Sequence, residues 1–183
     1  MAQEITAKST LIDVCFAVST ALDRVGAVAV LTGGSAATYY VPERYQSRDA
    51  DFVITMIRDE HAAAAALGEL GFVEERGIHV HSKSKYTVEF PPGPLAAGSA
   101  IIQHYETVRR GRQTLYVISR TDCVRDRLSA FYHWGDRSSL RTALAVARSG
   151  SIDLRAIERW STEEGAREKF QEFKALYNER RER

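Results

Sequence analysis

Residues 27–35 read Ala-Val-Ala-Val-Leu-Thr-Gly-Gly-Ser, and residues 48–54 read Arg-Asp-Ala-Asp-Phe-Val-Ile. Each stretch joins an apolar run to a small polar group. Short apolar runs bounded by turn residues are typical of buried strands. The sequence therefore predicts two buried strands, one ending at Gly33-Gly34-Ser35 and the other beginning beside Asp49 and Asp51.

The rest of the chain supplies further elements around these two strands. Capping residues and apolar spacing predict a helix from Ser9 or Thr10 to 22–23, a short helix at 36–40, and a helix from the cap Asp59 to Leu70. Apolar runs and turn residues predict strands at 27–31, 51–56 and 86–90, and an irregular strand at 72–80 that is interrupted at Gly77. Two further strands, 101–108 and 113–118, are joined across 109–112. From Ser119 onward the pattern predicts three or four helices, with breaks at Gly150-Ser151 and Gly165.

This order indicates an α+β fold, in which a mixed β-sheet is flanked by helices and followed by a C-terminal helical half. We expect two parts, a core at residues 1–118 and a helical region at residues 119–183.

Composition indicates an ordinary globular protein, with 183 residues, 44% hydrophobic and 27% charged. Lys and Arg total 25 against 24 Asp and Glu, so the net charge is +1. That balance gives no long-range attraction to nucleic acid or to an anionic membrane. Any polyanion must therefore be bound by a local patch.

Two sequence features indicate the cellular compartment. Cys15 and Cys123 lack metal-ligand or redox spacing, so we expect free, reduced thiols buried in amphipathic helices. Residues 1–10 have neither a basic leader nor an apolar signal core, and no segment approaches the length of a membrane span. A cytoplasmic protein without membrane contact is expected.

The acidic residues form the first part of a candidate site. Alternate side chains of a strand share one face, so Asp49 and Asp51 point the same way, with Cα atoms roughly 6.6 Å apart. Two such carboxylates suit one hard cation, or two cations about 4 Å apart, and Mg²⁺ prefers oxygen ligands. Glu89 lies between Val88 and Phe90, and it completes the site if its strand neighbours strand 51–56. An ion pair of Glu89 with Lys83 or Lys85 is the alternative.

The glycines form the second part. Gly33 and Gly34 let backbone N–H groups approach phosphate oxygens, and Ser35 offers a hydroxyl at the start of a helix. The stretch is not a Walker loop, because it lacks the lysine and the longer glycine spacing.

These residues resemble the nucleotidyltransferase superfamily that shares the DNA polymerase β type of palm. The matching motifs are Leu31-Thr32-Gly33-Gly34-Ser35, Arg48-Asp49-Ala50-Asp51-Phe52 and Thr87-Val88-Glu89-Phe90. The resemblance implies a Mg²⁺-dependent enzyme, with a two-metal site, that moves a nucleoside monophosphate from a nucleoside triphosphate to an acceptor hydroxyl. Asp49 and Asp51 would be metal ligands, and Glu89 would be a ligand or a general base.

The chain also resembles the small bacterial branch, which includes abortive-infection toxins and minimal nucleotidyltransferases. That toxin branch has a Lys-Leu-x-Ala segment and a later functional aspartate. Here the segment is Arg127-Leu128-Ser129-Ala130, followed by Asp136, so an arginine replaces the lysine. We expect Arg127 to contact phosphates and the acceptor to lie between the sheet and the helical half.

Several acceptors stay open: an RNA such as tRNA, a protein or a small molecule, with an antitoxin as a possible partner. Arg109, Arg110 and Arg112 form a basic turn that is a candidate for contact with an RNA backbone. The alternative function is a catalytically silent binding or regulatory protein with the same fold.

Overall fold

The structure, a computed structural model, describes residues 4–179. Its strands are β1 (Val28–Leu31), β2 (Asp49–Met56), β3 (Phe72–Glu75), β4 (Ile78–His81), β5 (Thr87–Glu89), β6 (Ala96–Ala97), β7 (Ala100–Ile101), β8 (Tyr105–Arg110) and β9 (Gln113–Ile118). Its helices are α1 (Leu11–Arg24), α2 (Gly33–Tyr40), α3 (Glu60–Glu69), α4 (Arg120–Trp134), α5 (Arg137–Arg148), α6 (Leu154–Glu163) and α7 (Arg167–Glu179).

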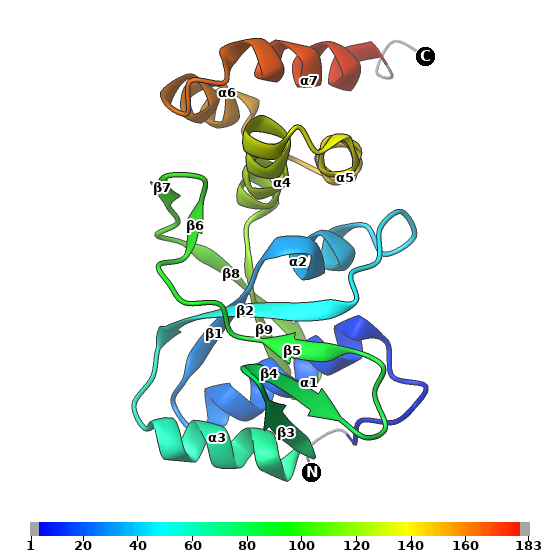
Figure 1. The fold of residues 1–183 in the computed structure, drawn as a ribbon, viewed down its shortest axis with the longest axis vertical. Helices are drawn as coiled ribbons and strands as arrows, with labels where there is room; N and C mark the ends of the chain where they lie inside the picture. Colours follow the sequence, from blue (N-terminus) through cyan, green and yellow to red (C-terminus); the bar gives the residue numbers. More distant parts are fainter. Residues whose placement is uncertain (1–3, 180–183) are drawn as a thin grey trace.

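Seven of the strands form one mixed sheet in the order β3-β4-β5-β2-β1-β9-β8 (Figure 1). Strand β1 runs antiparallel to β2 and parallel to β9, while β2 runs parallel to β5. Helices α1 and α3 lie on one side of the sheet, and α2 and the four C-terminal helices lie on the other (Figure 1). The predicted α+β class with a mixed sheet is therefore confirmed.

Helix capping explains where α1 and α3 begin. The Thr10 hydroxyl accepts from the N–H of Asp13, and the Asp13 carboxylate accepts from the N–H of Thr10, which forms a capping box. The Asp59 carboxylate accepts from the first N–H groups of α3. Both predicted helices are confirmed.

Strand alternation separates the two faces of β2. Ala50 and Phe52 are fully buried, on the opposite face from Asp49 and Asp51. Burial of the apolar face is what orients the two aspartates away from the core, as the sequence pattern indicates.

Three segments differ from the prediction. Residues 72–80 form a hairpin, β3–β4, because Arg76 and Gly77 both adopt positive φ angles at the turn. The predicted strand 101–108 begins only at Tyr105, because Ala100–Ile101 pairs back onto Ala96–Ala97 as a separate hairpin. Helix α2 begins at Gly33 rather than at residue 36, so the glycines belong to its first turn.

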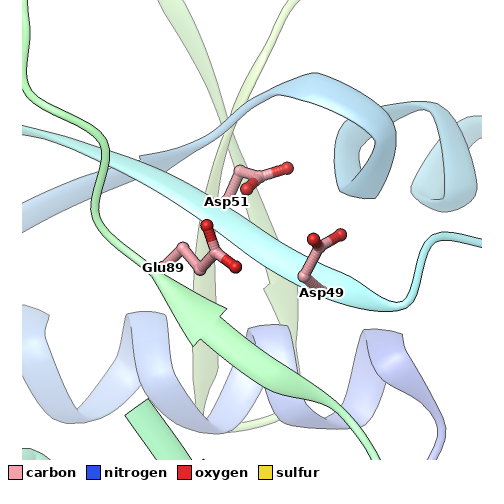
Figure 2. A group of neighbouring side chains, drawn as sticks. All are labelled: Asp49, Asp51 and Glu89. Atoms are coloured by element: carbon pink, nitrogen blue, oxygen red, sulfur yellow. The ribbon is translucent and has the colours of Figure 1, made fainter. Parts of the chain in front are cut away.

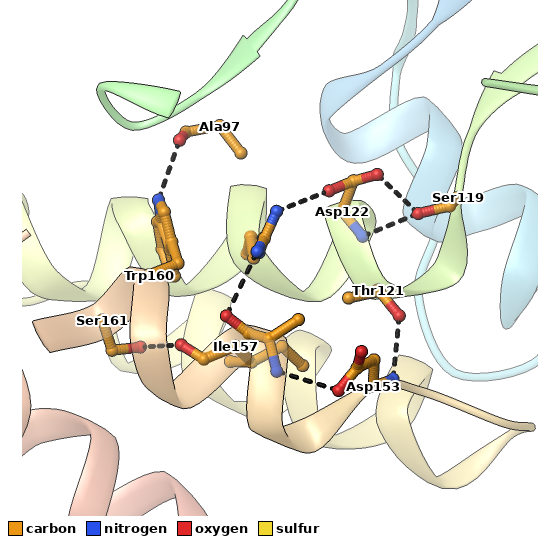
Figure 3. A network of polar contacts seen from close by, with 10 residues as sticks. Ala97, Ser119, Thr121, Asp122, Asp153, Ile157, Trp160 and Ser161 are labelled. Carbon is orange, nitrogen blue, oxygen red and sulfur yellow. Dashed lines mark hydrogen bonds and ion pairs between the residues drawn. The ribbon is translucent and has the colours of Figure 1, made fainter. Parts of the chain in front are cut away.

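The described part of the C-terminal half, up to residue 179, contains four helices, with the predicted breaks near Gly150 and at Gly165, whose φ is +70°. The buried Trp160 indole N–H donates to the carbonyl of Ala97 at 3.1 Å, which attaches the β6–β7 hairpin to α6 (Figure 3). One hydrophobic cluster includes buried residues of the sheet and of these helices. The division at residue 118 stays a prediction.

Cys15 and Cys123 are both free and fully buried. Burial raises the pKa of each thiol well above its ordinary value. Within residues 4–179, none of the helices combines the length and the apolar character that a bilayer-spanning helix needs.

Candidate metal and nucleotide site

The three predicted acids meet at the centre of the sheet. Strand β2 pairs in parallel with β5, and the register places Asp51 opposite Glu89 and Asp49 opposite Thr87. One carboxylate oxygen from each acid lies within 4.8 Å of the other two. Figure 2 shows the three side chains together on one face of these strands, beside the start of α2. All three are half-buried, so the cluster is open to a ligand.

The acids repel one another. Burial and the charges of Asp49 and Glu89 together raise the pKa of Asp51 to about 6, while Arg127 acts in the opposite direction. Across the described residues, no Lys, Arg or His forms an ion pair with any of the three acids. A bound cation would relieve this repulsion.

The alternative partners of Glu89 are engaged elsewhere. Lys83 forms an ion pair with Glu4 at 2.8 Å, and the Lys85 ammonium lies 5.1 Å from the centre of the Tyr86 ring. The ion pair considered for Glu89 is therefore not formed.

Glycine is needed at positions 33 and 34 because neighbouring side chains approach the backbone closely there. Gly33 has a φ of +62°, and a Cβ atom there would lie 2.8 Å from Oδ2 of Asp51. A Cβ atom on Gly34 would lie 2.9 Å from the Tyr45 hydroxyl. The first N–H groups of a helix have no intrahelical acceptor, so those of residues 33–35 are donors beside the carboxylates.

Ser35 has a positioning role that the sequence did not indicate. Its side chain is fully buried, and its hydroxyl donates to the carbonyl of Thr32 at 2.8 Å and accepts from the N–H of Asp51 at 3.1 Å. The hydroxyl thus holds α2 against β2. Contact between this hydroxyl and a phosphate stays a prediction, because the buried hydroxyl would have to exchange these bonds for the ligand.

Ser47 also belongs to the site, although the sequence pattern did not indicate it. Its hydroxyl donates to Oδ1 of Asp49 at 2.7 Å, and its N–H donates to the Thr38 hydroxyl at 2.8 Å. The Thr38 hydroxyl in turn donates to the carbonyl of Gly34 at 3.1 Å. This chain orients the Asp49 carboxylate from α2. A serine two residues before an acid was the available signal, and by itself it is weak.

Arg127 lies on α4, near the acids. Its side chain is 17% exposed, and its guanidinium donates twice to the Asp126 carboxylate, at 2.9 and 2.6 Å. Its charge also opposes the rise in the pKa of Asp51 and contributes, after the bonds from Ser139, to the lowered pKa of Asp136. A cation from the helical half therefore lies near the metal candidates, with its own carboxylate partner.

Asp136 caps α5. Its carboxylate accepts from the Ser138 N–H at 2.8 Å and from the Ser139 hydroxyl at 2.6 Å, and the bonds from Ser139 hold its pKa below the ordinary value. The structure thus gives this aspartate a local role at the start of the helix.

Two arginines of the basic turn at 109–112 bind side chains within the protein. Arg109 donates to the Thr114 hydroxyl at 2.6 Å, and Arg110 pairs with Asp13 at 2.8 Å. Contact between this turn and RNA stays a prediction.

Comparison with known proteins supports the fold alone. No protein-family model matches the chain, and no curated protein matches it. Among solved structures, the chain resembles an antigenic nucleotidyltransferase-like protein from Paracoccidioides brasiliensis, with a TM-score of 0.57 and 16% sequence identity over 77% of each chain. The fold is therefore nucleotidyltransferase-like.

Proposed function

We propose that this protein is a metal-dependent nucleotidyltransferase, which moves a nucleoside monophosphate from a nucleoside triphosphate to an acceptor hydroxyl. One observation carries the proposal: three carboxylates converge within 4.8 Å beside the first turn of α2, in a nucleotidyltransferase-like fold. The small bacterial toxin branch is a narrower form of the same proposal.

The donor set fits Mg²⁺. All three candidate ligands are carboxylates, which hard divalent cations prefer. The pKa of Asp51 is raised by burial and by repulsion from Asp49 and Glu89, and a cation would offset that repulsion. Asp49, Asp51 and Glu89 would hold one or two ions. When bound, the metal neutralises phosphate charge and lowers the pKa of the acceptor hydroxyl.

The chain's own groups then have distinct roles. The N–H groups of residues 33–35 donate to phosphate oxygens of the triphosphate. Glu89 takes the proton of the acceptor hydroxyl, the acceptor oxygen bonds to the α-phosphorus, and the bond from that phosphorus to pyrophosphate breaks. Arg127 contributes positive charge on the helical side of the site, as the pKa of Asp51 already reflects.

Titration calorimetry with Mg²⁺ and each nucleoside triphosphate tests the binding step. We expect binding by the wild type and strong weakening in Asp51→Asn and Glu89→Gln. Glu74→Gln is the matched control, because Glu74 is exposed on β3, away from the three acids. Equal binding by all variants would contradict the proposal.

Label transfer tests the reaction. A triphosphate labelled at the α-phosphate is offered with total RNA, with protein and with small hydroxyl compounds, and the labelled product identifies the acceptor. Binding without transfer to any acceptor would favour the silent binding protein instead.

Growth arrest tests the toxin form of the proposal. Arg127 and the segment that follows it lie on α4 near the acids, which is compatible with the resemblance to the toxin branch. Induced expression in bacteria should stop growth for the wild type and not for Asp51→Asn, and an antitoxin would restore growth. Unimpaired growth with the wild type would count against this form.

A further inference from the structure

The guanidinium of Arg127 lies near the three acids but binds a different carboxylate. Arg127 belongs to α4, which packs against α2, the helix whose first turn borders the acids. Its charge opposes the rise in the pKa of Asp51 that burial and the charges of Asp49 and Glu89 produce. Within residues 4–179, however, the carboxylate that it binds is that of Asp126. The cation nearest in influence to the acid cluster is therefore held by a residue of its own helix.

The bond between Arg127 and Asp126 fixes the direction of the arginine side chain. Consecutive residues of a helix point about 100° apart and do not face each other. Arg127 nevertheless donates from Nε at 2.9 Å and from Nη2 at 2.6 Å, both to Oδ2 of Asp126. The two side chains are only 17% and 19% exposed, so solvent screens their attraction little. The arginine side chain is thus bent across the surface of α4 toward its neighbour.

The same bond leaves part of the guanidinium available to a substrate. An arginine carries more N–H donors than the two that Asp126 accepts. Among the described residues, the hydrogen bonds of the Arg127 guanidinium are these two alone. Guanidinium groups match phosphate oxygens well, and the remaining donors can contact a phosphate while the bond to Asp126 persists. Asp126 therefore does not compete with the triphosphate for Arg127.

We propose that Asp126 is a positioning residue, which holds the Arg127 guanidinium away from the three acids so that their oxygens stay open to a divalent cation. This inference rests on the proposed function. A partly buried guanidinium is attracted to a cluster of three carboxylates. An ion pair with the cluster would occupy the oxygens that a metal needs. Asp126 supplies another carboxylate for the guanidinium, and it lies outside the group of described acids that converge within 4.8 Å.

The NMR signal of the Arg127 Nε–H group tests this placement in mildly alkaline, metal-free buffer. The signal is identified by its loss in Arg127→Gln. We expect Asp126→Asn to shift the signal, because the guanidinium leaves its neighbour for the acids. Adding Asp51→Asn should shift it again in the Asp126→Asn background and should have little effect when Asp126 is present. A merely structural role of Asp126 would not make the signal depend on Asp51.

Calorimetric titration with Mg²⁺ alone tests the consequence for the metal site. We expect Asp126→Asn to bind Mg²⁺ roughly tenfold more weakly than the wild type, a coupling typical of groups in contact. Arg127→Gln should bind Mg²⁺ at least as tightly as the wild type, and adding Asp126→Asn to it should have little effect. The matched control is Asp122→Asn, which makes the same charge change on α4 at a carboxylate paired with Arg125 at 3.1 Å, and it should bind like the wild type.

Two outcomes would overturn the inference. One is an Arg127 signal that stays independent of Asp51 in the Asp126→Asn background. The other is an equal loss of Mg²⁺ affinity from Asp126→Asn with and without Arg127, which would make Asp126 a direct source of charge at the site. If thermal unfolding shows that Asp126→Asn is poorly folded, Asp126→Ala takes its place in both experiments.

The metal-free spectra separate this inference from the proposed function. If the wild type binds neither Mg²⁺ nor triphosphate while the Arg127 signal behaves as expected, the proposed function fails and the placement of Arg127 by Asp126 stands. If the wild type binds both but the signal does not respond to Asp126→Asn, this inference fails alone.

Discussion

Asp51 is half-buried and the side chain of Glu164 is only 4% exposed, yet the surroundings shift the pKa values of the two carboxylates in opposite directions. The Glu164 carboxylate accepts hydrogen bonds from the N–H of Ser99, at 2.7 Å, and from the Ser99 hydroxyl. It also lies 3.0 Å from Nε2 of His133, within hydrogen-bond distance. Burial alone would raise its pKa, but the bonds from Ser99 and His133 outweigh burial and lower it. Asp51 instead faces two further acids, and burial together with their charges raises its pKa to about 6.

The difference separates a structural carboxylate from a candidate ligand-binding one. The Glu164 carboxylate joins the turn between β6 and β7 to the helical half, and its bonding requirements are met within the chain. Asp51 has no such partner for its charge among residues 4–179. A folded protein tolerates three clustered acids at an energetic cost, and a bound cation would offset that cost.

The largest expected effect comes from removing one acid of the cluster. Asp51→Asn should lower the rate of nucleotidyl transfer on the order of 10²–10³-fold, because it removes one charged group that supports the transition state. Steady-state kinetics with α-labelled triphosphate measure this loss, and a variant with near wild-type turnover would contradict the catalytic interpretation of the cluster.

The next effect is on stability, at the structural carboxylate. Glu164→Ala should reduce the free energy of unfolding by roughly 2–3 kcal/mol, since it leaves the donors of Ser99 without their charged acceptor. Chemical denaturation measures the change, with Glu163→Ala as the control because Glu163 is exposed. Equal effects of the two substitutions would show that Glu164 is not a structural contact.

The third effect is on the pH dependence of stability, which for Asp51 has the opposite sign from that of an ordinary paired carboxylate. The pKa of Asp51 rises from 3.8 to about 6 on folding, so its contribution to stability is complete below about pH 4 and is lost as the pH rises through 6. In metal-free buffer at pH 8, Asp51→Asn should therefore be more stable than the wild type by about 1–2 kcal/mol, after allowance for screening of a partly exposed group.

Adding Mg²⁺ provides a second test of the pH dependence expected from Asp51. Thermal unfolding of the wild type should shift upward with Mg²⁺ above pH 6 and much less below it, because protonated Asp51 is a poorer ligand. A Mg²⁺ effect that does not change with pH would argue against Asp51 as a ligand.

The smallest effect is expected from the lysine considered as a partner of Glu89. Lys85→Ala should leave both stability and Mg²⁺ affinity unchanged within error, because the Lys85 ammonium lies against the Tyr86 ring and forms no ion pair in the described part of the chain. Calorimetric titration with Mg²⁺ measures this. Tighter metal binding in the variant would show that Glu89 had been paired after all.

Local patterns predicted many of the elements well. Capping residues located α1 and α3, and alternation placed Asp49 and Asp51 on one face of β2. The predictions failed at residues 72–80 and 101–108, where short hairpins with positive φ angles at their turns reverse the chain. Such pairing leaves only weak traces in local composition.

The sequence by itself determined which residues could carry the chemistry, because residue type and a period of two already place two carboxylates together. Only the tertiary structure decided that β5 lies parallel to β2 with Glu89 opposite Asp51, and that Ser35 holds the two elements in place. It also decided that the Arg127 guanidinium binds Asp126. These juxtapositions follow from packing of the whole core, whose long-range contacts outweigh the preference of any single segment.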